Sequence, residues 1–511
     1  MTGITFAAID IGSYHVVMEI FEISPKQGLN SIDYVEKRID LGRNTYAEGK
    51  VSNELVKELC DILKDFKRVM KTYQVKGYRA CATSAIREAE NARIVLGRIY
   101  QATGISVEIL NNSEQRFLGY KSVACTENDF PNIITRGTAV LDLGGGSIQV
   151  SLFDKDMLIT TQNLQIGYLR LRGHLAHLEN SVTRSDVLVE EYIQNEVASF
   201  KKVHLKDRKI ENVIVIGNNL PDILADHAGS QKVIKKEEYM ELYHKIVENS
   251  PMELSRAWKL SKEKASLLLP IVVVCRKFIE EFGADTIWIP GTKLTHGIAY
   301  DYAERMNWIK ASHNFDNDIV MAARTIGKRY GVSNAHVQNV REIALAMYDG
   351  TKKIHGLGAR ERLLLECAVY LHGCGKFVSL SNVAECNYQI IMATEIIGIS
   401  HLEQEMIAQI VRGLTVPLES YETLTRTSDI TIVEYMTITK LIAILRIANA
   451  MDLSHMQKVQ EIRATVRDDR LMINVTTNRD YTLEQGLLEE RMEFFENVFG
   501  IRPVLKVKHL I

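Results

Sequence analysis

The sequence predicts an α/β protein with two related lobes around a cleft, followed by a helical domain and a small C-terminal α/β domain. Two strand–aspartate–glycine–strand motifs lie about 130 residues apart, which indicates two related halves. Strands alternate with helices up to about residue 305, and this pattern favours a mixed sheet with helices on both faces. From Asn307 the pattern becomes helical. The expected domains are residues 1–128, 129–305, 306–458 and 459–511.

Periodicity and apolar runs mark the elements of the two lobes. The segment Asn53–Thr72 carries large apolar residues at helical spacing, so we expect a helix that lies on a sheet. Near the end of the second lobe, Thr286–Ile289 is a short apolar run typical of a buried strand, and the turn segment Pro290–Gly297 follows it.

The rest of the chain is expected to be helical until strands return near the C-terminus. Amphipathic stretches predict helices over Val340–Tyr348, Glu361–Leu371 and Thr437–Met451. The small C-terminal domain is expected to contain strands over Glu461–Thr476, a helix over Leu483–Phe499 and a last strand over Arg502–Lys508.

The second of the two motifs, Val140–Val150, has the pattern of a β-hairpin that binds a phosphate. An apolar strand runs into Asp142 and three glycines, then resumes as a strand. Glycine reaches positive φ without strain, so successive backbone N–H groups can point at an anion, and Asp142 sits where a divalent cation would bridge to phosphate oxygens. A tight hairpin with structural glycines is the alternative interpretation.

The N-terminal segment Phe6–Ile20 repeats this design with Asp10 and Gly12-Ser13. Two such hairpins predict two lobes that each offer one loop to a nucleotide or polyphosphate in the cleft. The order of the motifs is more informative than either motif alone, because a single Asp-x-Gly is common.

Four further segments make the chain resemble a known family. Ala80–Asn91 is similar to the family's Ala-Thr-Ser-Ala-x-Arg-x-Ala-x-Asn segment, and Val107–Phe117 aligns without a gap to its Ile-Ser-Gly-x-Glu-Glu-Ala-Arg-Leu stretch. Gln165–Leu171 and Val213–Gly217 take the places of two later family elements. The sequence thus resembles the exopolyphosphatase and guanosine pentaphosphate phosphohydrolase (Ppx/GppA) family, a branch of the actin-like ATPase superfamily.

The resemblance implies a Mg²⁺-dependent phosphohydrolase of actin-like fold, with Mn²⁺ as the alternative ion. It implies that Asp10 and Asp142 hold the metal and that Glu114 directs the attacking water. It implies phosphate-binding roles for Gly12, Ser13, Thr83, Ser84, Arg87, Gly144, Gly145, Gly146, Ser147 and Arg170. Each has a structural alternative: the aspartates could cap turns, Arg87 could pair with a surface glutamate, and Glu114 could begin a helix.

Four departures from the family pattern bear on activity. The first loop has bulky Tyr14-His15 where the family has Asn-Ser, and Asn218-Asn219 follow Gly217 where the family has a threonine. Leu110-Asn111 replace a Ser-Gly pair. Gln149 stands at a catalytic glutamate of the family, and an amide neither takes a proton nor supplies a full charge.

Two functions therefore stand as hypotheses, with a kinase-like relative as a third. The first is release of terminal orthophosphate from inorganic polyphosphate or conversion of guanosine pentaphosphate (pppGpp) to ppGpp. The second is a regulatory protein that binds polyphosphate or an alarmone with weakened catalysis. The resemblance also suggests a homodimer.

The composition bears on the partners and the cellular compartment that we expect for this chain. Among 511 residues, 62 Lys and Arg balance 64 Asp and Glu, so nucleic-acid binding is not expected. The seven cysteines are scattered, as in a reduced cytoplasmic protein, and no apolar run or signal peptide predicts a membrane association.

The helical domain contains Tyr370–Lys376 and Leu445–His455, which resemble HD-type metal-binding segments. Gly373 replaces the carboxylate that normally follows the histidine. His355, His372 and Asp452 could come together around a metal, but satisfied structural groups in a degenerate HD fold are the favoured interpretation.

Overall fold

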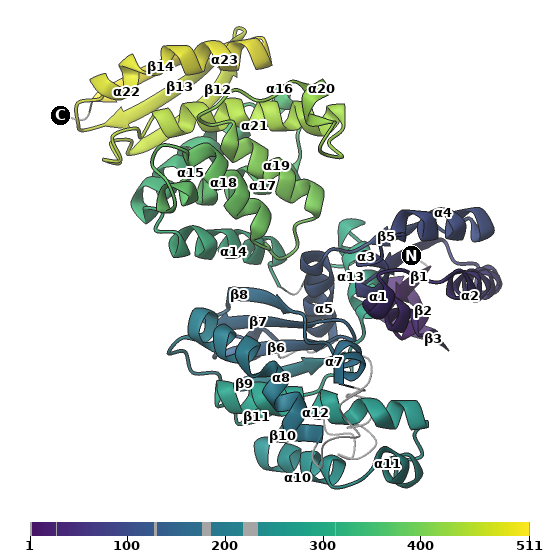
Figure 1. The fold of residues 1–511 in the computed structure, drawn as a ribbon. Helices are drawn as coiled ribbons and strands as arrows, with labels where there is room; N and C mark the ends of the chain where they lie inside the picture. Colours follow the sequence, from purple (N-terminus) through teal and green to yellow (C-terminus); the bar gives the residue numbers. More distant parts are fainter. Residues whose placement is uncertain are drawn as a thin grey trace. The chain divides into compact units, whose positions relative to one another are not determined.

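The computed structural model describes residues 3–26, 28–126, 130–175, 185–217, 233–311 and 313–509. The chain divides into two compact units, Met1–Asn314 and Phe315–Ile511 (Figure 1). The first unit contains two lobes, each built on one sheet, and the second combines helices with a small sheet. In the part of the chain that is described, no helix has the length and hydropathy needed to cross a bilayer.

Lobe I is built on a five-stranded sheet in which antiparallel and parallel strands meet at β1. Its strands are β1 (Ile4–Ile11), β2 (His15–Ser24), β3 (Gly28–Arg38), β4 (Gly77–Ala82) and β5 (Val107–Ile109). Their order is β3-β2-β1-β4-β5. The first three are antiparallel, whereas β4 lies parallel to both β1 and β5.

Lobe II repeats this plan. Its strands are β6 (Thr138–Leu143), β7 (Ile148–Asp154), β8 (Met157–Leu164), β9 (Asn212–Ile216), β10 (Val233–Lys235) and β11 (Thr286–Trp288). The order β8-β7-β6-β9-β11 has the same directions as the lobe I sheet, and β10 adds an antiparallel edge. The two related halves expected from the paired motifs are therefore present as two sheets of matching topology.

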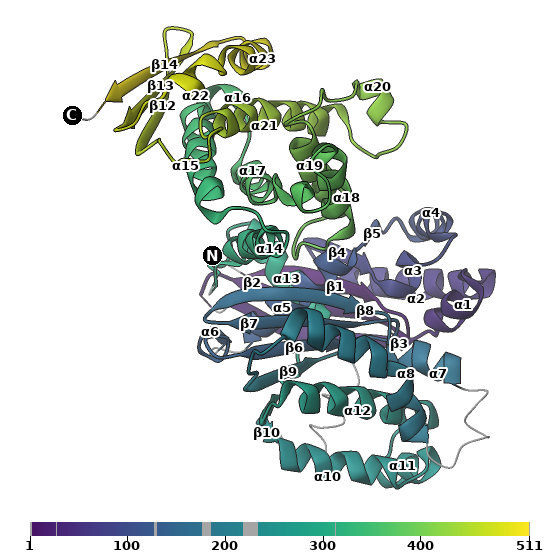
Figure 2. The same cartoon turned by 60° about the vertical axis from the view of Figure 1, so that its left-hand side comes forward.

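The helices of the first unit cover these sheets (Figure 2). They are α1 (Leu41–Glu48), α2 (Asn53–Thr72), α3 (Ser84–Arg87), α4 (Ala92–Thr103), α5 (Asn112–Thr126), α6 (Phe130–Ile133), α7 (Tyr168–Leu175), α8 (Ser185–Phe200), the π-helix η2 (Lys201–Leu205), α10 (Lys236–Val247), α11 (Pro251–Ala257), α12 (Lys262–Phe282) and α13 (Leu294–Arg305).

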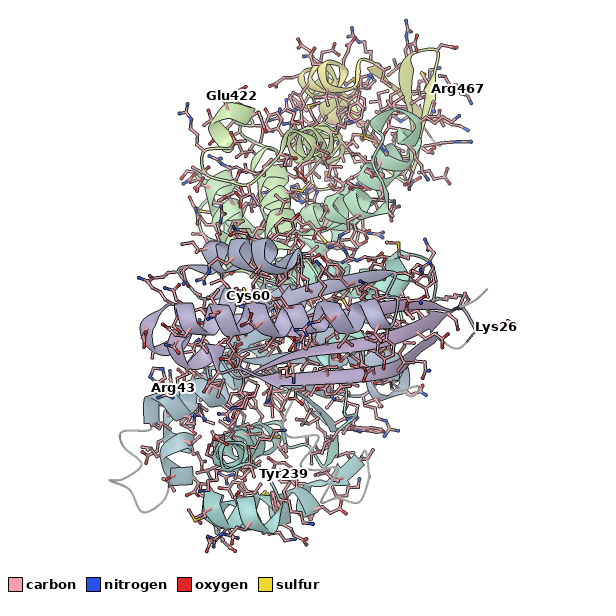
Figure 3. The ribbon with its side chains drawn as sticks, turned by 90° about the vertical axis from the view of Figure 1, so that its right-hand side faces the viewer. Lys26, Arg43, Cys60, Tyr239, Glu422 and Arg467 are labelled. Carbon is pink, nitrogen blue, oxygen red and sulfur yellow. The ribbon has the colours of Figure 1, made fainter. Side chains whose placement is uncertain are left out.

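Helix α2 has the bounds that the sequence predicts. Ser52 caps it by accepting a hydrogen bond from the Leu55 N–H, and its apolar stripe, which includes Leu59 and Phe66, is buried against the lobe I sheet. Figure 3 looks onto this helix, with Cys60 labelled, where it lies across the strands.

The opposite face of the lobe I sheet packs against α5 and α13, which run side by side. Their contact is close because residue 297 is a glycine. A Cβ added to Gly297 would lie 1.9 Å from the Leu118 carbonyl oxygen. Helix α13 follows the last strand of lobe II and packs on lobe I. Its first residues therefore lie beside the loops of both lobes.

The second unit is a helical bundle joined to a three-stranded sheet of order β12-β13-β14. Its elements are α14 (Phe315–Arg329), α15 (Asn334–Gly350), α16 (Lys352–His355), α17 (Ala359–Leu371), the 3₁₀-helix η3 (Cys374–Phe377), α18 (Val383–Ala393), α19 (His401–Arg412), α20 (Tyr421–Leu424), α21 (Ile432–Ala450), β12 (Glu461–Arg467), β13 (Arg470–Thr477), α22 (Thr482–Gly486), α23 (Glu489–Phe499) and β14 (Arg502–His509).

The prediction of one helix over Leu483–Phe499 is wrong, because the segment breaks between α22 and α23. Gly486 ends the first piece, and glycine is a poor helix former. The break falls at Leu487-Leu488, where Leu488 is fully buried. The helices expected over 340–348, 361–371 and 437–451 are present within α15, α17 and α21.

Candidate active site

The candidate active site is a cavity between the two lobes, of about 70 Å³, which has room for roughly five water molecules. It lies where the parallel strands of both sheets end. Residues that follow β1, β4 and β5 in lobe I, and β6, β9 and β11 in lobe II, all line it. In α/β sheets ligands bind at the carboxyl ends of the strands, so this placement is the one expected for a ligand site.

The two predicted hairpins face this cavity with equivalent geometry. The Gly12 N–H donates to the His15 carbonyl at 2.9 Å, and the Gly144 N–H donates to the Ser147 carbonyl at 3.1 Å. In each lobe the aspartate stands two residues before this glycine. The duplicated motif therefore folds into the same turn twice.

Both aspartates lie in the cavity wall, where Asp10 is buried and Asp142 is partly exposed. Burial, together with the charge of Asp142, raises the pKa of Asp10 to about 7. Burial also raises the pKa of Asp142 to about 7, although the Arg116 guanidinium opposes this rise. Two carboxylates in this environment are a strong site for a cation.

A divalent cation fits these residues. Asp10 is 5% exposed, and its Oδ1 has no hydrogen-bond partner among the described residues. Mg²⁺ is commonly held by one or two carboxylates, with substrate phosphates and water as the remaining ligands. Two aspartates are all that the described residues offer, because among them no group of three or more His, Cys, Asp or Glu side chains is arranged to hold a metal.

Hydroxyl groups from the residues after β1 and β4 and from α1 meet at the first loop. The Oγ atoms of Ser13 and Ser84 lie 3.0 Å apart, and the Tyr46 hydroxyl contacts both, at 2.7 and 2.9 Å. Thr83 is tied to the end of β1, since its N–H donates to the Ile11 carbonyl. These side chains form a polar wall next to the Gly12 turn.

The second loop is fixed by the start of α7. The Leu169 N–H donates to the Gly145 carbonyl at 2.9 Å, and the Arg170 Nε donates to the Gly146 carbonyl at 3.0 Å. Arg170 also contacts Glu88 of lobe I through its Nη2 at 2.5 Å. In this structure Arg170 therefore holds the loop to lobe I. Gly144 and Gly145 line the cavity, and Ser147 is buried at the base of the loop.

Arg87 and Glu114 lie behind the cavity wall in this structure. The Arg87 Nη1 donates to the Leu110 carbonyl at 2.7 Å and to the Gln115 Oε1 at 3.1 Å. Glu114 forms a capping box at the start of α5, where its Oε2 accepts from the Asn111 N–H at 3.0 Å. Its neighbour Gln115 lines the cavity.

The residues that depart from the family pattern are also placed by the structure. Tyr14 and His15 both line the cavity, and Tyr14 packs into the hydrophobic core of lobe II. Burial lowers the pKa of His15, although Glu36 opposes this shift. Gln149 lies opposite Asp142 on β7, is 2% exposed, and neither of its amide atoms has a partner among the described residues. Asn218 and Asn219 lie outside the described residues.

Several residues of the site were not identified from the sequence. Gln115, Tyr168, Thr292 and Lys293 line the cavity, and Tyr46 contacts the cavity-lining Ser13. A signal existed for Thr292 and Lys293, because they follow a predicted buried strand and precede a helix. No sequence pattern pointed to Tyr46, because its position depends on the packing of α1 against the first loop.

In the second unit, His336 takes the place considered for His355. The His336 Nδ1 lies 2.7 Å from Asp452 Oδ2, and its Nε2 lies 3.2 Å from His372 Nε2. His355 instead contacts the Tyr348 carbonyl at 3.0 Å. His336, His372 and Asp452 therefore lie together as in part of an HD-type site, but Gly373 stands where that site has its second carboxylate.

Comparison with known proteins identifies the family. The model of the Ppx/GppA phosphatase family matches residues 20–306, and the model of domain III of these phosphatases matches residues 321–494. A curated relative from Photobacterium profundum, named guanosine-5'-triphosphate,3'-diphosphate pyrophosphatase, is 19% identical over 427 residues, which cover 81% of each chain.

Solved structures share the fold. The Ppx/GppA family member of Aquifex aeolicus is 21% identical, with a TM-score of 0.50 over 60% of this chain and 99% of that one. An exopolyphosphatase from Cytophaga hutchinsonii is 18% identical, with a TM-score of 0.50 over 60% of this chain and 99% of that one. With matching lobes, paired aspartate hairpins and both domain models aligned, the chain belongs to the Ppx/GppA phosphatase family.

Proposed function

We propose that this protein is a Mg²⁺-dependent phosphohydrolase that releases the terminal orthophosphate of inorganic polyphosphate or of pppGpp. The observation that carries the proposal is the pair of carboxylates, buried Asp10 and partly exposed Asp142, which lie near the ends of the equivalent strands β1 and β6 and line one cavity beside two glycine turns. A site with two acids and two anion-binding turns suits a phosphate that arrives with a cation.

Each group of residues in the site has its own role in the proposed reaction. The backbone N–H groups of the two turns and the hydroxyls of Ser13 and Ser84 hold the terminal phosphate. Mg²⁺, when bound by Asp10 and Asp142, supplies positive charge against the transferring group. Glu114 is proposed to orient the water and accept its proton, a role for which its carboxylate must leave the Asn111 cap and enter the cavity beside Gln115. The water oxygen adds to phosphorus, the bridging P–O bond breaks, and orthophosphate and the shortened anion leave.

The choice of substrates rests on the family and on the names of relatives. One relative is named as a pyrophosphatase of a guanosine polyphosphate, and a solved structure of the same fold is named as an exopolyphosphatase. Both names describe removal of phosphate from a phosphoanhydride, so both substrates belong in the test.

The test is release of orthophosphate from long-chain polyphosphate and from pppGpp, compared between the wild-type protein and Glu114→Gln. Glutamine keeps the hydrogen bond to the Asn111 N–H but cannot accept a proton. We expect release to fall by about 100- to 1000-fold with an unchanged melting temperature. Release that survives in Glu114→Gln would remove this residue from the mechanism.

Gln149 favours a second candidate, a protein that binds polyphosphate or an alarmone with weakened catalysis. Its amide is buried without a hydrogen-bond partner among the described residues, at a position where the family has a catalytic glutamate. Under the main proposal Gln149→Glu changes release by less than about threefold, because Glu114 suffices. A gain of about 100-fold would instead favour the regulatory protein.

A further inference from the structure

The N-terminus of α13 opens into the cavity from the side of lobe II. The chain leaves β11, turns through Pro290-Gly291, and enters the twelve-residue helix after Lys293, which is extended at the cap position. Thr292, Lys293 and Leu294 line the cavity. The first N–H groups of a helix lack intrahelical acceptors and carry partial positive charge, so this end attracts an anion.

Thr292 gives an independent reason to expect a ligand there. Its side chain is 2% exposed, and its Oγ1 has no hydrogen-bond partner among the described residues. A buried hydroxyl without a partner is unfavourable, and such groups usually find an acceptor. Because Thr292 lines the cavity, an oxygen of a bound ligand is the acceptor that this position can reach.

Lys293 adds a positive charge to the lining of the cavity. Among the described residues that line the cavity, it is the one with a permanent positive charge, since the acids are Asp10 and Asp142 and burial lowers the pKa of His15. Its Nζ lies 3.4 Å from the centre of the ring of Tyr34, a residue of β3 that is not among those lining the cavity. Such a cation–π contact is weaker than a charge-assisted hydrogen bond to phosphate, so a ligand can draw the ammonium away.

This group is distinct from the glycine turns. In the lobe II sheet, β11 is separated from β6 by β9, which places its end about 10 Å from the end of β6. The turns and aspartates at β1 and β6 would hold the terminal phosphate.

We propose that Thr292, Lys293 and the first N–H groups of α13 form a second anion subsite, which binds the phosphoryl groups next to the terminal one. The proposal rests on the proposed function for the terminal phosphate and adds the residues that would bind the phosphoryl groups linked to it. The subsite also places positive charge where the leaving phosphate gains negative charge. Phosphate monoesters lack a group to fill it.

The test measures binding of tripolyphosphate and of orthophosphate to the full chain by calorimetry with Mg²⁺. Lys293→Ala is expected to weaken tripolyphosphate binding by about 30-fold and orthophosphate binding by less than about threefold. Thr292→Val is expected to weaken tripolyphosphate binding by about tenfold while keeping or raising the melting temperature, because it removes an unpartnered hydroxyl. Lys262→Ala, an exposed lysine of α12, is the matched control with unchanged binding.

Binding separates this proposal from the proposed function, because it needs no turnover. Tripolyphosphate that binds through Lys293 but is never hydrolysed would support the subsite and contradict the hydrolase. Hydrolysis that proceeds with unchanged tripolyphosphate affinity in both variants would overturn the subsite and leave the hydrolase standing. An equal loss for both anions would also overturn it, since the residues would then belong to the terminal phosphate site.

Discussion

Asp142→Asn is expected to lower orthophosphate release by about 1000-fold or more, because the amide cannot supply the charge that holds the cation. The same substitution is expected to stabilise the metal-free protein. Burial raises the pKa of Asp142 from 3.8 to about 7. Above that pH the carboxylate is ionised in surroundings that disfavour its charge, which lowers the stability of the folded protein. Asn carries no charge and avoids this cost, which is at most about 4 kcal/mol.

The pH dependence follows from the direction of the shift. Between pH 3.8 and about 7 the folded wild-type protein binds more protons at Asp142 than the unfolded chain, so its stability falls as pH rises through this window. We expect Asp142→Asn to melt higher than wild type at about pH 8 and equally at about pH 4, without metal. Added Mg²⁺ should raise the melting temperature of wild type at the higher pH, and much less that of the variant.

Asp61→Asn is the matched control, since Asp61 is an exposed residue of α2. It should change neither orthophosphate release nor the response to Mg²⁺. A variant Asp142→Asn that releases orthophosphate at the wild-type rate, or that melts below wild type at about pH 8 without metal, would contradict the role given to this carboxylate.

Gly167→Ala is expected to lower orthophosphate release by about 100-fold and the free energy of unfolding by about 2 to 4 kcal/mol. A Cβ at this position would lie 2.3 Å from the Gly145 oxygen and 2.4 Å from both the Gly146 carbonyl carbon and the Ser147 nitrogen. All three are backbone atoms of the second loop, so the loop must move away. A phosphate-binding turn that shifts by about 1 Å loses its alignment with the reacting group.

Gly173→Ala, in the helix α7 that Gly167 directly precedes, provides the control. A Cβ at Gly173 meets no atom within 4 Å, so the substitution should raise stability by about 0.5 to 1 kcal/mol through helix propensity and leave activity unchanged. Release assays and urea unfolding measure both effects. Equal activities in the two variants would show that the second loop does not position the phosphate.

The sequence predicted the parts of the fold that are encoded locally. The two hairpins follow from a few consecutive residues each, and helix α2 follows from its own periodicity and its Ser52 cap. The helix expected over Leu483–Phe499 is instead two helices that break after Gly486, a poor helix former, and the apolar periodicity of the segment did not indicate this break.

The candidate site was predicted in its loops but not in its surroundings. Asp10, Gly12, Asp142 and Gly144 carry a local motif, and all line the cavity. Lys293 reaches the cavity only because α13 packs on lobe I, far from it in sequence. Local spacing also gave no way to see that Arg170 would contact a loop carbonyl and Glu88 in this structure.

The central claim is that this cavity removes a terminal phosphate from a phosphoanhydride. The most direct measurement is ³¹P nuclear magnetic resonance of the full chain with Mg²⁺ and a mixture of long-chain polyphosphate and pppGpp. We predict growth of the orthophosphate signal together with loss of a terminal-phosphate signal from at least one substrate, and none of this growth with Asp142→Asn. Spectra of both substrates that stay unchanged with the wild-type protein would contradict the claim.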